Sequence, residues 1–391
     1  MLFRSVEQLC GPRYQRPSDR TATRYGHQSG FVCVGGQKLT IDRPRVRSTR
    51  PDEGEVALPL YDKLQQPEAL PQAFLRRMVR GVSCRDYEGV VDLAADSFGV
   101  KKSSVSRGFV RASARSLRDW ARRRYDSTRF VAVFIDGIEY AGETMVVAVG
   151  LDEHGTKQVL GLRQGATENA EVVKSLLEEL VERGLKPSQP TLFVLDGAKA
   201  LVAGVKRVFG RFAVVQRCQV HKKRNVQAHV AERHHPELNR RLHEAYSETN
   251  YAAALGQLES TVRWLAKLSP DAAASLQEGM AETLTVVRLG LPATLRKTLA
   301  STNVIESALG VTRTVTGRVK RWRDGDMRSR WCAAGLRRAE EKFHRVKGYR
   351  QIPQLVAALD AELLDVKPKA DRKSTRLNSS HIQKSRMPSS A

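Results

Sequence analysis

The sequence predicts an α/β fold, in which a mixed sheet carries packed helices, an all-helical insertion interrupts it, and a helical module precedes it. Between residues 127 and 234, short apolar runs of strand length alternate with amphipathic stretches of helix length. Residues 235–300 carry helical periodicity only. Two strand-like runs, FVAVFIDG at Phe130–Gly137 and TLFVLDG at Thr191–Gly197, end in Asp-Gly. Such unbroken runs are typical of strands buried on both faces, and a carboxylate at the end leaves the core where a cleft can open.

The composition indicates a globular protein with a polyanionic partner. Apolar residues make up 41% of the 391 residues, which excludes wholesale disorder. The 66 Lys and Arg residues exceed the 42 Asp and Glu residues, and the net charge of +24 favours nucleic acid through attraction to phosphates. A soluble protein with basic tails and a ribosomal-type binder are the alternatives. The five scattered cysteines, the lack of a run of about 20 apolar residues and the lack of a P-loop favour the cytoplasm, at the nucleoid, and argue against a membrane protein or a nucleotide-driven motor.

The first 66 residues are basic and rich in Gly and Pro, and we expect an irregular N-terminal arm that lies along a phosphate backbone. A strand pair that includes Lys38–Arg47 is the alternative. Pro44 would confine such a pair to the edge of a sheet, because proline has no N–H to donate to a neighbouring strand.

Residues 67–126 are predicted to form a DNA-binding region of the helix-turn-helix type. An apolar stripe runs from Tyr87 to Phe98, Gly99 breaks it, and a second helix begins at about Ser103. The segment 101–124 holds nine Lys and Arg residues against one Asp (101, 102, 107, 111, 115, 118, 122, 123 and 124 against 119). An ordinary solvated helix pair would show a similar pattern.

Residues 127–234 are predicted to form the first part of a catalytic core. Three successive strands, a crossover helix, and then strand, helix and strand make a mixed sheet. The expected elements are strands Phe130–Ile135, Thr144–Leu151 and Lys157–Leu162, helix Glu168–Arg183, strand Thr191–Leu195, helix Lys199–Phe209 and strand Phe212–Val215. This is the order of the ribonuclease-H-like fold. An all-helical insertion follows at 235–300, then a final Glu-bearing helix and C-terminal helices at 301–366.

Three acidic residues on separate predicted elements, Asp136, Asp196 and Glu306, suit phosphodiester chemistry with two divalent ions about 3.5–4 Å apart. Hard oxygen ligands suit Mg²⁺. Each acid also has a purely structural interpretation. Asp136-Gly137 would serve as a hairpin turn, Asp196 would cap the next helix, and Asn303-Val-Ile-Glu306 would be a variant capping box.

A resemblance to a known family covers most of the chain, from about Gly35 to Asp360. The sequence resembles the bacterial insertion-sequence transposases of the Mutator-like superfamily, which are DDE enzymes with a ribonuclease-H-like core and a helical insertion before the final Glu. The blocks that carry the resemblance are FVAVFIDGIEY, TLFVLDGAKAL, VVQRCQVHKKRNV and STNVIESALGVTRTVTGRVKRWRDGD. Their acids are spaced by 60 (196 − 136) and 110 (306 − 196) residues. The resemblance implies that Asp136, Asp196 and Glu306 bind two Mg²⁺ ions, with Mn²⁺ able to substitute.

The resemblance also covers Cys218-x-x-His221. Because a structural zinc site needs four ligands and no second pair is present, we expect Cys218 and His221 to support the site rather than to bind zinc, and we place Asn303 with them. Basic residues expected to contact DNA lie in the helix-turn-helix region, beside His221, and in or near a row with Glu306. They are Lys101, Lys102, Arg107, Arg111, Lys222, Lys223, Arg224, Arg313, Lys320 and Arg321.

We therefore expect a transposase that binds double-stranded DNA at terminal inverted repeats and in the target, and works as at least a dimer. The alternatives are an inactive or domesticated sequence-specific DNA-binding protein and a ribonuclease-H-like nuclease. The tail at 367–391 is polar and without periodicity from Asp371 onward, and resembles translated adapter sequence. We expect it to be disordered and non-native, which resequencing of the genomic junction would test.

Overall fold

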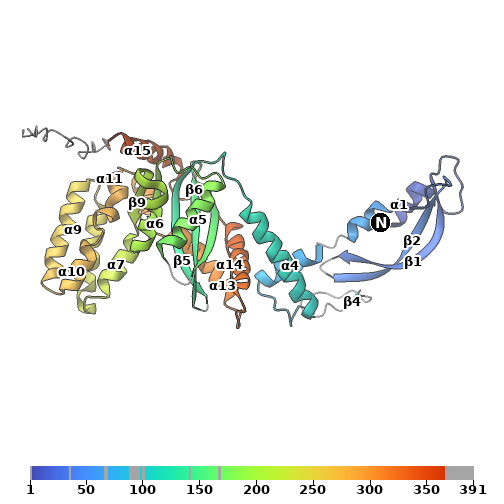
Figure 1. Ribbon diagram of the computed structural model, residues 1–391, viewed down its shortest axis with the longest axis horizontal. Helices are drawn as coiled ribbons and strands as arrows, with labels where there is room; N and C mark the ends of the chain where they lie inside the picture. The colour runs from blue at the N-terminus through green and yellow to red at the C-terminus, as the bar shows by residue number, and fades with distance from the viewer. Residues whose placement is uncertain are drawn as a thin grey trace, which may run out of the picture.

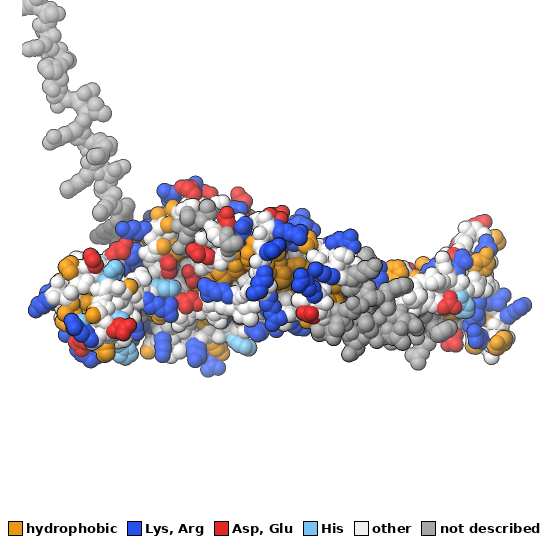
Figure 2. Space-filling view, turned by 90° about the horizontal axis from the view of Figure 1, so that it is seen from below, with side chains coloured by type: hydrophobic (Ala, Val, Ile, Leu, Met, Phe, Trp, Pro, Cys, Tyr) orange, Lys and Arg blue, Asp and Glu red, His pale blue; other side chains and the backbone are white. Residues whose placement is uncertain are grey.

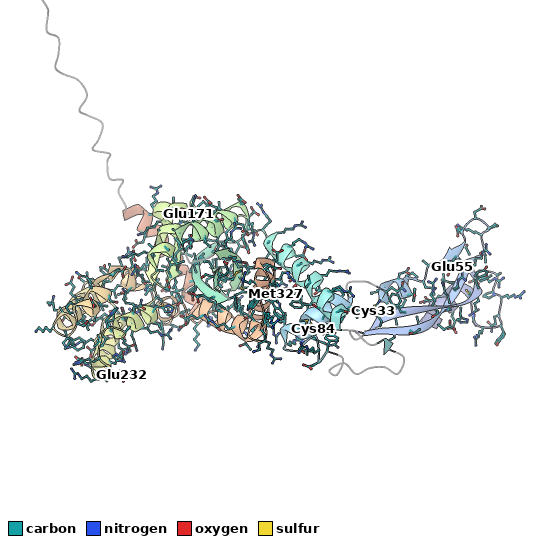
Figure 3. The ribbon with its side chains drawn as sticks, turned by 60° about the horizontal axis from the view of Figure 1, so that its bottom comes forward. Cys33, Glu55, Cys84, Glu171, Glu232 and Met327 are labelled. Carbon is teal, nitrogen blue, oxygen red and sulfur yellow. The ribbon has the colours of Figure 1, made fainter. Side chains whose placement is uncertain are left out.

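The computed structural model describes residues 2–34, 37–65, 69–87, 97–98, 102–140, 142–165 and 169–365. The molecule is elongated, with a small N-terminal sheet at one end, a central sheet and a group of helices at the other end (Figure 1). Glu55 lies in the N-terminal sheet, and Glu232 lies toward the helical end (Figure 3). Lys101 and the predicted disordered tail lie outside the described residues. No helix in the described ranges is long and apolar enough to cross a membrane.

The central sheet has five strands in the order β7-β6-β5-β8-β9. Strand β6 is antiparallel to β5 and β7, whereas β8 is parallel to β5 and to β9. The prediction of a mixed sheet is therefore confirmed. The strands are β5 (Phe130–Tyr140), β6 (Glu143–Asp152), β7 (Lys157–Gly165), β8 (Thr191–Leu195) and β9 (Ala213–Arg217).

The sequence predicted that strand β5 stops at Asp136. In the structure β5 continues to Tyr140, so the predicted end is wrong. Asp136 and Gly137 pair with Val147 and Val146 of β6, so the hairpin-turn interpretation of Asp136-Gly137 is wrong. The parallel pairing of β5 with β8 stops one residue earlier, at Ile135. Asp136 is therefore the first residue of β5 past the β8 pairing, and from there on only the antiparallel ladder with β6 sustains the strand.

Helices cover both faces of this sheet. On one face, α5 (Ala170–Glu182) and α6 (Lys199–Phe209) pack on Val133, Ile135 and the alternate residues of the neighbouring strands. On the other face, α12 (Ala293–Leu299), α13 (Asn303–Thr316), α14 (Gly325–Glu340) and α15 (Ile352–Asp365) pack on Ala132, Phe134 and their neighbours. The period of two along β5 thus divides its apolar residues between two cores.

Residues 219–300 hold only helices, and most of them share a separate apolar core. Gln216 at the end of β9 ties this group to the sheet, because its amide donates to the Thr283 carbonyl at 2.9 Å and its side-chain oxygen accepts from the Val286 N–H at 3.0 Å. The helices are α7 (Gln219–Gln227), α8 (His235–Ser247), α9 (Tyr251–Ala266), α10 (Pro270–Gln277), α11 (Thr285–Arg288) and α12, with short 3₁₀ turns at Glu232–His234 and Ala281–Leu284.

The expectation of an irregular N-terminal arm is wrong. A long antiparallel hairpin of β1 (Ala22–Val34) and β2 (Gln37–Ser48) packs with α1 (Leu2–Cys10), β3 (Glu55–Val56) and α2 (Pro59–Leu64) on a small apolar core. Gly26 has a φ of +76° where the pairing register shifts, and the long hairpin accommodates Pro44 opposite His27 beside that shift.

The helix-turn-helix prediction has a mixed outcome. Helix α3 (Ala69–Val79) packs against α4 (Lys102–Ala121) around Phe74 and Phe109. The predicted first helix at Tyr87–Phe98 falls largely outside the described residues. Its described ends are not helical, because Tyr87 lies in a turn and β4 (Ser97–Phe98) pairs with β2.

Candidate active site

Asp136 and Asp196 lie side by side on one face of the central sheet. Ile135 is paired with Leu195 in the parallel β5–β8 ladder, and the two Asp residues come next, Asp136 within β5 and Asp196 directly after the end of β8. Asp136 shares its face with Phe134, and Asp196 continues the alternation of Val194, toward the side on which α13 packs. The sequence predicted that these two carboxylates come together, and the register of the β5–β8 ladder is what relates their positions.

Glu306 reaches the same place from the first turn of α13. Ile305 and Leu309, which flank Glu306 on one side of this helix, are buried in the core, and the Glu306 side chain stays 29% exposed. The variant capping box is wrong, because Thr302, not Asn303, is the N-cap of α13. Asp196 is also not the N-cap of α6; that residue is Ala198, whose N–H donates to an Asp196 carboxylate oxygen at 2.8 Å.

The three acids act on one another electrostatically at Asp136. Burial is the main cause that raises the pKa of Asp136, and the negative charges of Asp196 and Glu306 add to it. The Gly137 N–H and His221 act in the lowering direction, and the net pKa is about 6. Carboxylates gathered without a full set of compensating cations form a site that a divalent cation would stabilise.

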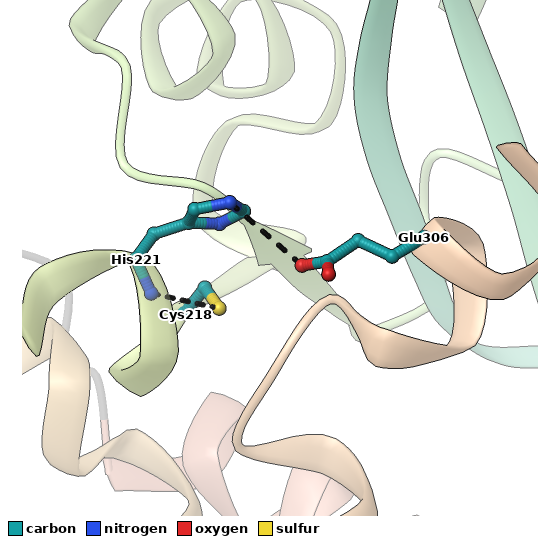
Figure 4. A group of neighbouring side chains, drawn as sticks. All are labelled: Cys218, His221 and Glu306. Atoms are coloured by element: carbon teal, nitrogen blue, oxygen red, sulfur yellow. Dashed lines mark hydrogen bonds and ion pairs between the residues drawn. The ribbon is translucent and has the colours of Figure 1, made fainter. Parts of the chain in front are cut away.

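Cys218 and His221 lie beside Glu306, as Figure 4 shows. Cys218 is the N-cap of α7, and its buried sulfur accepts from the N–H groups of His221 at 3.5 Å and Thr302 at 3.4 Å. Burial alone would raise the Cys218 pKa, but these donors and the His221 ring lower it. The His221 pKa rises to about 9, mainly through Cys218 and with help from Glu306, whose Oε1 lies 3.7 Å from Nε2.

Sequence reasoning missed Thr302, a buried residue at the centre of this group. Its Oγ1 lies 2.7 Å from a Glu306 carboxylate oxygen, 3.3 Å from Cys218 Sγ and 3.3 Å from His221 Nδ1. A hydroxyl has one proton to donate, and the shortest distance indicates that the carboxylate receives it. The signal in the sequence was a Thr four residues before Glu306, which places both on one side of a helix start.

Cys218, His221 and Glu306 each offer one atom that could bind a metal. These three atoms lie within 4.8 Å of one another, which is close enough for a single metal ion. Cys218 is already surrounded by hydrogen-bond donors, so the geometry also suits a thiolate held within the protein. Asn303, predicted to support the site, is exposed and lines a groove between α12 and α13. It has no hydrogen bond to the acids in the part of the chain that the structure describes.

Lys222 was predicted to contact DNA, and this is wrong. Its side chain is buried, and Nζ donates to the carbonyls of Ser275 at 2.6 Å and Glu278 at 2.7 Å at the C-terminal end of α10. Carbonyls at the end of a helix have no partner within the helix, so a Lys that crosses from α7 satisfies them. Burial lowers the Lys222 pKa.

We expect Lys222→Met to lower the free energy of unfolding by about 2–4 kcal/mol, because the two carbonyls at the end of α10 lose a charged donor that is itself buried. Chemical denaturation would measure this loss. Arg224→Met, at an exposed position of the same helix, is the matched control and should change stability by less than about 0.5 kcal/mol. Equal stability of the two variants would contradict the role given to Lys222.

The remaining basic residues lie at the surface. Lys102, Arg107 and Arg111 are exposed on α4, Arg224 is exposed on α7, and Lys223 is half-buried. Helix α13 ends at Thr316, so the predicted row that joins Glu306, Arg313 and Lys320 is wrong beyond Arg313. Lys320 and Arg321 are exposed in the connection to α14. Figure 2 shows Lys and Arg side chains along the length of one face of the molecule.

The raised pKa of Asp136 predicts a pH-dependent effect on stability. The native carboxyl binds its proton more tightly than the unfolded one, so the free energy of unfolding of the metal-free protein falls as pH rises from about 4 to 6. Asp136→Asn removes this loss. The free energy of unfolding of the variant minus that of wild type should therefore be about 2 kcal/mol larger at pH 7.5 than at pH 4.5. Denaturation in the presence of chelator at both pH values would measure this. The same difference at both pH values would contradict the prediction.

Comparison with known proteins gives a consistent result. Residues 4–324 match the family described as "Transposase, Mutator family". The chain is 30% identical over 313 residues to the transposase for insertion sequence element ISRM5 of Rhizobium meliloti, covering 77% of this chain and 74% of that protein. It is 29% identical to the transposase for IS406 of Burkholderia multivorans, over 74% of this chain and 76% of the relative. The transposase for IS1201 of Lactobacillus helveticus is 25% identical, over 63% and 67% of the two chains.

Proposed function

Because the chain belongs to the Mutator family of transposases, we propose that it binds the terminal inverted repeats of an insertion sequence and catalyses metal-dependent DNA cleavage and strand transfer. The observation that supports this proposal most directly is the electrostatic effect of Asp196 and Glu306 on Asp136, whose pKa the charges of both acids help to raise. The strand order and the helices between β9 and α13 support a ribonuclease-H-like core.

The donor set fits Mg²⁺, because three carboxylates offer hard oxygen ligands and leave positions for water. We propose Asp136, Asp196 and Glu306 as the ligands. Divalent ions held by these residues would supply Lewis-acid chemistry, lowering the pKa of the attacking water or hydroxyl and stabilising negative charge on the leaving oxygen. Mn²⁺, which prefers similar ligands, would substitute.

The other residues of the site would orient these ligands and balance their charge. Thr302 holds the Glu306 carboxylate by a hydrogen bond, and Gly137 holds that of Asp136. His221, with a pKa of about 9, carries a proton at neutral pH and presents Nε2 toward Glu306, where it would also face a phosphodiester oxygen. In this scheme water is the first nucleophile, and the released 3′-hydroxyl attacks target DNA in the second step. Strand transfer exchanges one phosphodiester for another and so needs no ATP.

Exposed basic residues supply the DNA contacts in this proposal. Lys102, Arg107 and Arg111 on α4, with Arg224 and Arg313 nearer the acids, would bind phosphates and fix the register of the duplex. Two element ends must be held together for transfer, so we propose at least a homodimer in the complex with DNA.

The test is cleavage and strand transfer on labelled duplex that carries the inverted repeats flanking the gene, with Mg²⁺, with Mn²⁺ and with chelator. Cuts at the repeat ends, followed by joining to target DNA, would support the proposal. Specific binding without cleavage would favour a DNA-binding protein that has lost activity, and cleavage of RNA–DNA hybrids irrespective of sequence would favour a ribonuclease-H-like nuclease.

A further inference from the structure

A groove of about 610 Å³ lies between α12, the N-terminus of α13 and the loop that precedes α15. A second hollow of about 480 Å³ adjoins it on the side of α7 and α8. The two share Ala293, Lys297, Ser301 and Asn303 in their walls, so they form one continuous groove. None of the DNA contacts proposed above uses it.

The walls of the larger hollow suit a polyanion. They carry four basic side chains, Lys157, Lys297, Arg345 and Lys347, and hydroxyl groups between them, but no Asp or Glu. Within the described ranges none of the four basic side chains has an acidic partner. Lys157 and Arg345 instead lie over the rings of Phe343 and Tyr349. Their charge is therefore available to a ligand, and hydroxyls are common partners of phosphate oxygens.

Hydrogen bonds hold the two sides of the groove in place. Thr298 Oγ1 on α12 lies 3.0 Å from the Lys347 carbonyl and 3.0 Å from the Thr294 carbonyl of its own helix, so the two carbonyls share its one proton. The Val346 N–H donates to the Gly155 carbonyl in the β6–β7 turn at 3.0 Å. These bonds fix the loop that carries Arg345 and Lys347 against both α12 and the sheet. A ligand would thus meet a preformed surface, which lowers the entropic cost of binding.

The groove begins beside the acidic group. Asn303 and Ser307 of α13 line it, and at about 100° per residue Glu306 lies roughly 60° from Asn303 around the same helix. The N-terminus of α13, which is the positive end of its dipole, also opens on the groove through Ser301 and Asn303. A chain of phosphates that passes the acids would reach Lys297 and Arg345 next.

We propose that this groove binds the backbone phosphates of a DNA strand next to the phosphodiester that is cut. The inference rests on the proposed function for the position of the cut, whereas the binding of phosphates rests on the charge and shape of the groove alone. Lys297, Arg345 and Lys347 are the residues that contact the phosphates, and sequence reasoning assigned none of them to DNA.

The test is the triple variant Lys297→Gln, Arg345→Gln and Lys347→Gln, measured for binding to inverted-repeat duplex over a range of salt concentrations. When the logarithm of the binding constant is plotted against the logarithm of the salt concentration, each phosphate contact adds about 0.9 to the magnitude of the slope. The triple variant should therefore lose about 2 to 3 from this slope, and it should bind at least about tenfold more weakly near 0.1 M salt. Methylphosphonates placed one at a time near the cut remove single phosphate charges. They should weaken binding by wild type but not by the variant.

The matched control is Lys186→Gln, Arg263→Gln and Lys267→Gln, which removes the same charge from exposed positions outside the groove. It should retain most of the slope and the response to methylphosphonates. If the groove variant keeps the wild-type slope while wild type cuts the repeats, the groove proposal is overturned and the proposed function stands. If wild type never cuts, but the groove variant loses slope and affinity for DNA of any sequence, the proposed function fails and the groove proposal stands. Thermal unfolding of both triple variants checks that they fold.

Discussion

Asp136→Asn, Asp196→Asn and Glu306→Gln are each expected to lower the rate of strand cleavage at least about 10³-fold while binding of inverted-repeat DNA persists. Amides keep the size of the side chains and remove the charge that would hold a divalent cation. Removal of one group that stabilises a transition state electrostatically typically lowers the rate about 10²–10³-fold. Loss of a metal ligand should lower the rate by more than this, because it weakens the binding of the metal itself. Single-turnover cleavage of labelled duplex, with binding measured on the same preparations, gives both quantities.

A control for general damage to the fold is Glu237→Gln on α8. Glu237 is a partly exposed acid paired with Arg240 and Arg241, well removed in sequence from the three acids, and this variant should cleave as wild type does. Cleavage within tenfold of wild type by any one of the three amide variants would remove that residue from the metal site. Loss of binding together with cleavage would instead point to misfolding.

The sheet could be predicted from sequence because its signals are local. The bounds of β8 and α6 match the predicted Thr191–Leu195 and Lys199–Phe209. The apolar run of β8 is followed by Asp-Gly and the amphipathic run of α6 by Gly, so the end of each element is marked in the sequence. The end of β5 could not be found this way. Beyond Asp136 the strand is sustained by pairing with β6, and a polar residue within a strand then looks like its end.

Contacts between distant segments account for the other errors. Lys222 belongs to a strongly basic run, and nothing in the sequence says that α10 ends where its side chain arrives. The hairpin of β1 and β2 contains Gly and Pro that argue for irregular structure, but tertiary packing and a local register shift accommodate them. The groove beside α13 unites residues from the β6–β7 region, α12 and the loop before α15, which no motif connects.

Thr302→Val is expected to lower the cleavage rate about 10–100-fold with little change in DNA binding. Valine has nearly the same shape, so the packing at the start of α13 is kept, but the hydrogen bond to Glu306 is lost and its carboxylate is free to turn toward His221. Groups that hold metal ligands from outside typically contribute effects of this size. Because the change acts on a ligand, the Mg²⁺ concentration for half-maximal cleavage should rise as well.

Thr302→Ser is the matched variant for this prediction, since it keeps the hydroxyl and removes only a methyl group. It should cleave within about threefold of wild type and need no more Mg²⁺, whereas a role for Thr302 in packing alone would make the serine variant the worse of the two. That ordering follows because serine loses a buried methyl group, about 1 kcal/mol, while valine keeps the apolar volume. A valine variant with wild-type cleavage and wild-type Mg²⁺ dependence would show that Glu306 is held by the backbone of α13 and needs no help from the hydroxyl.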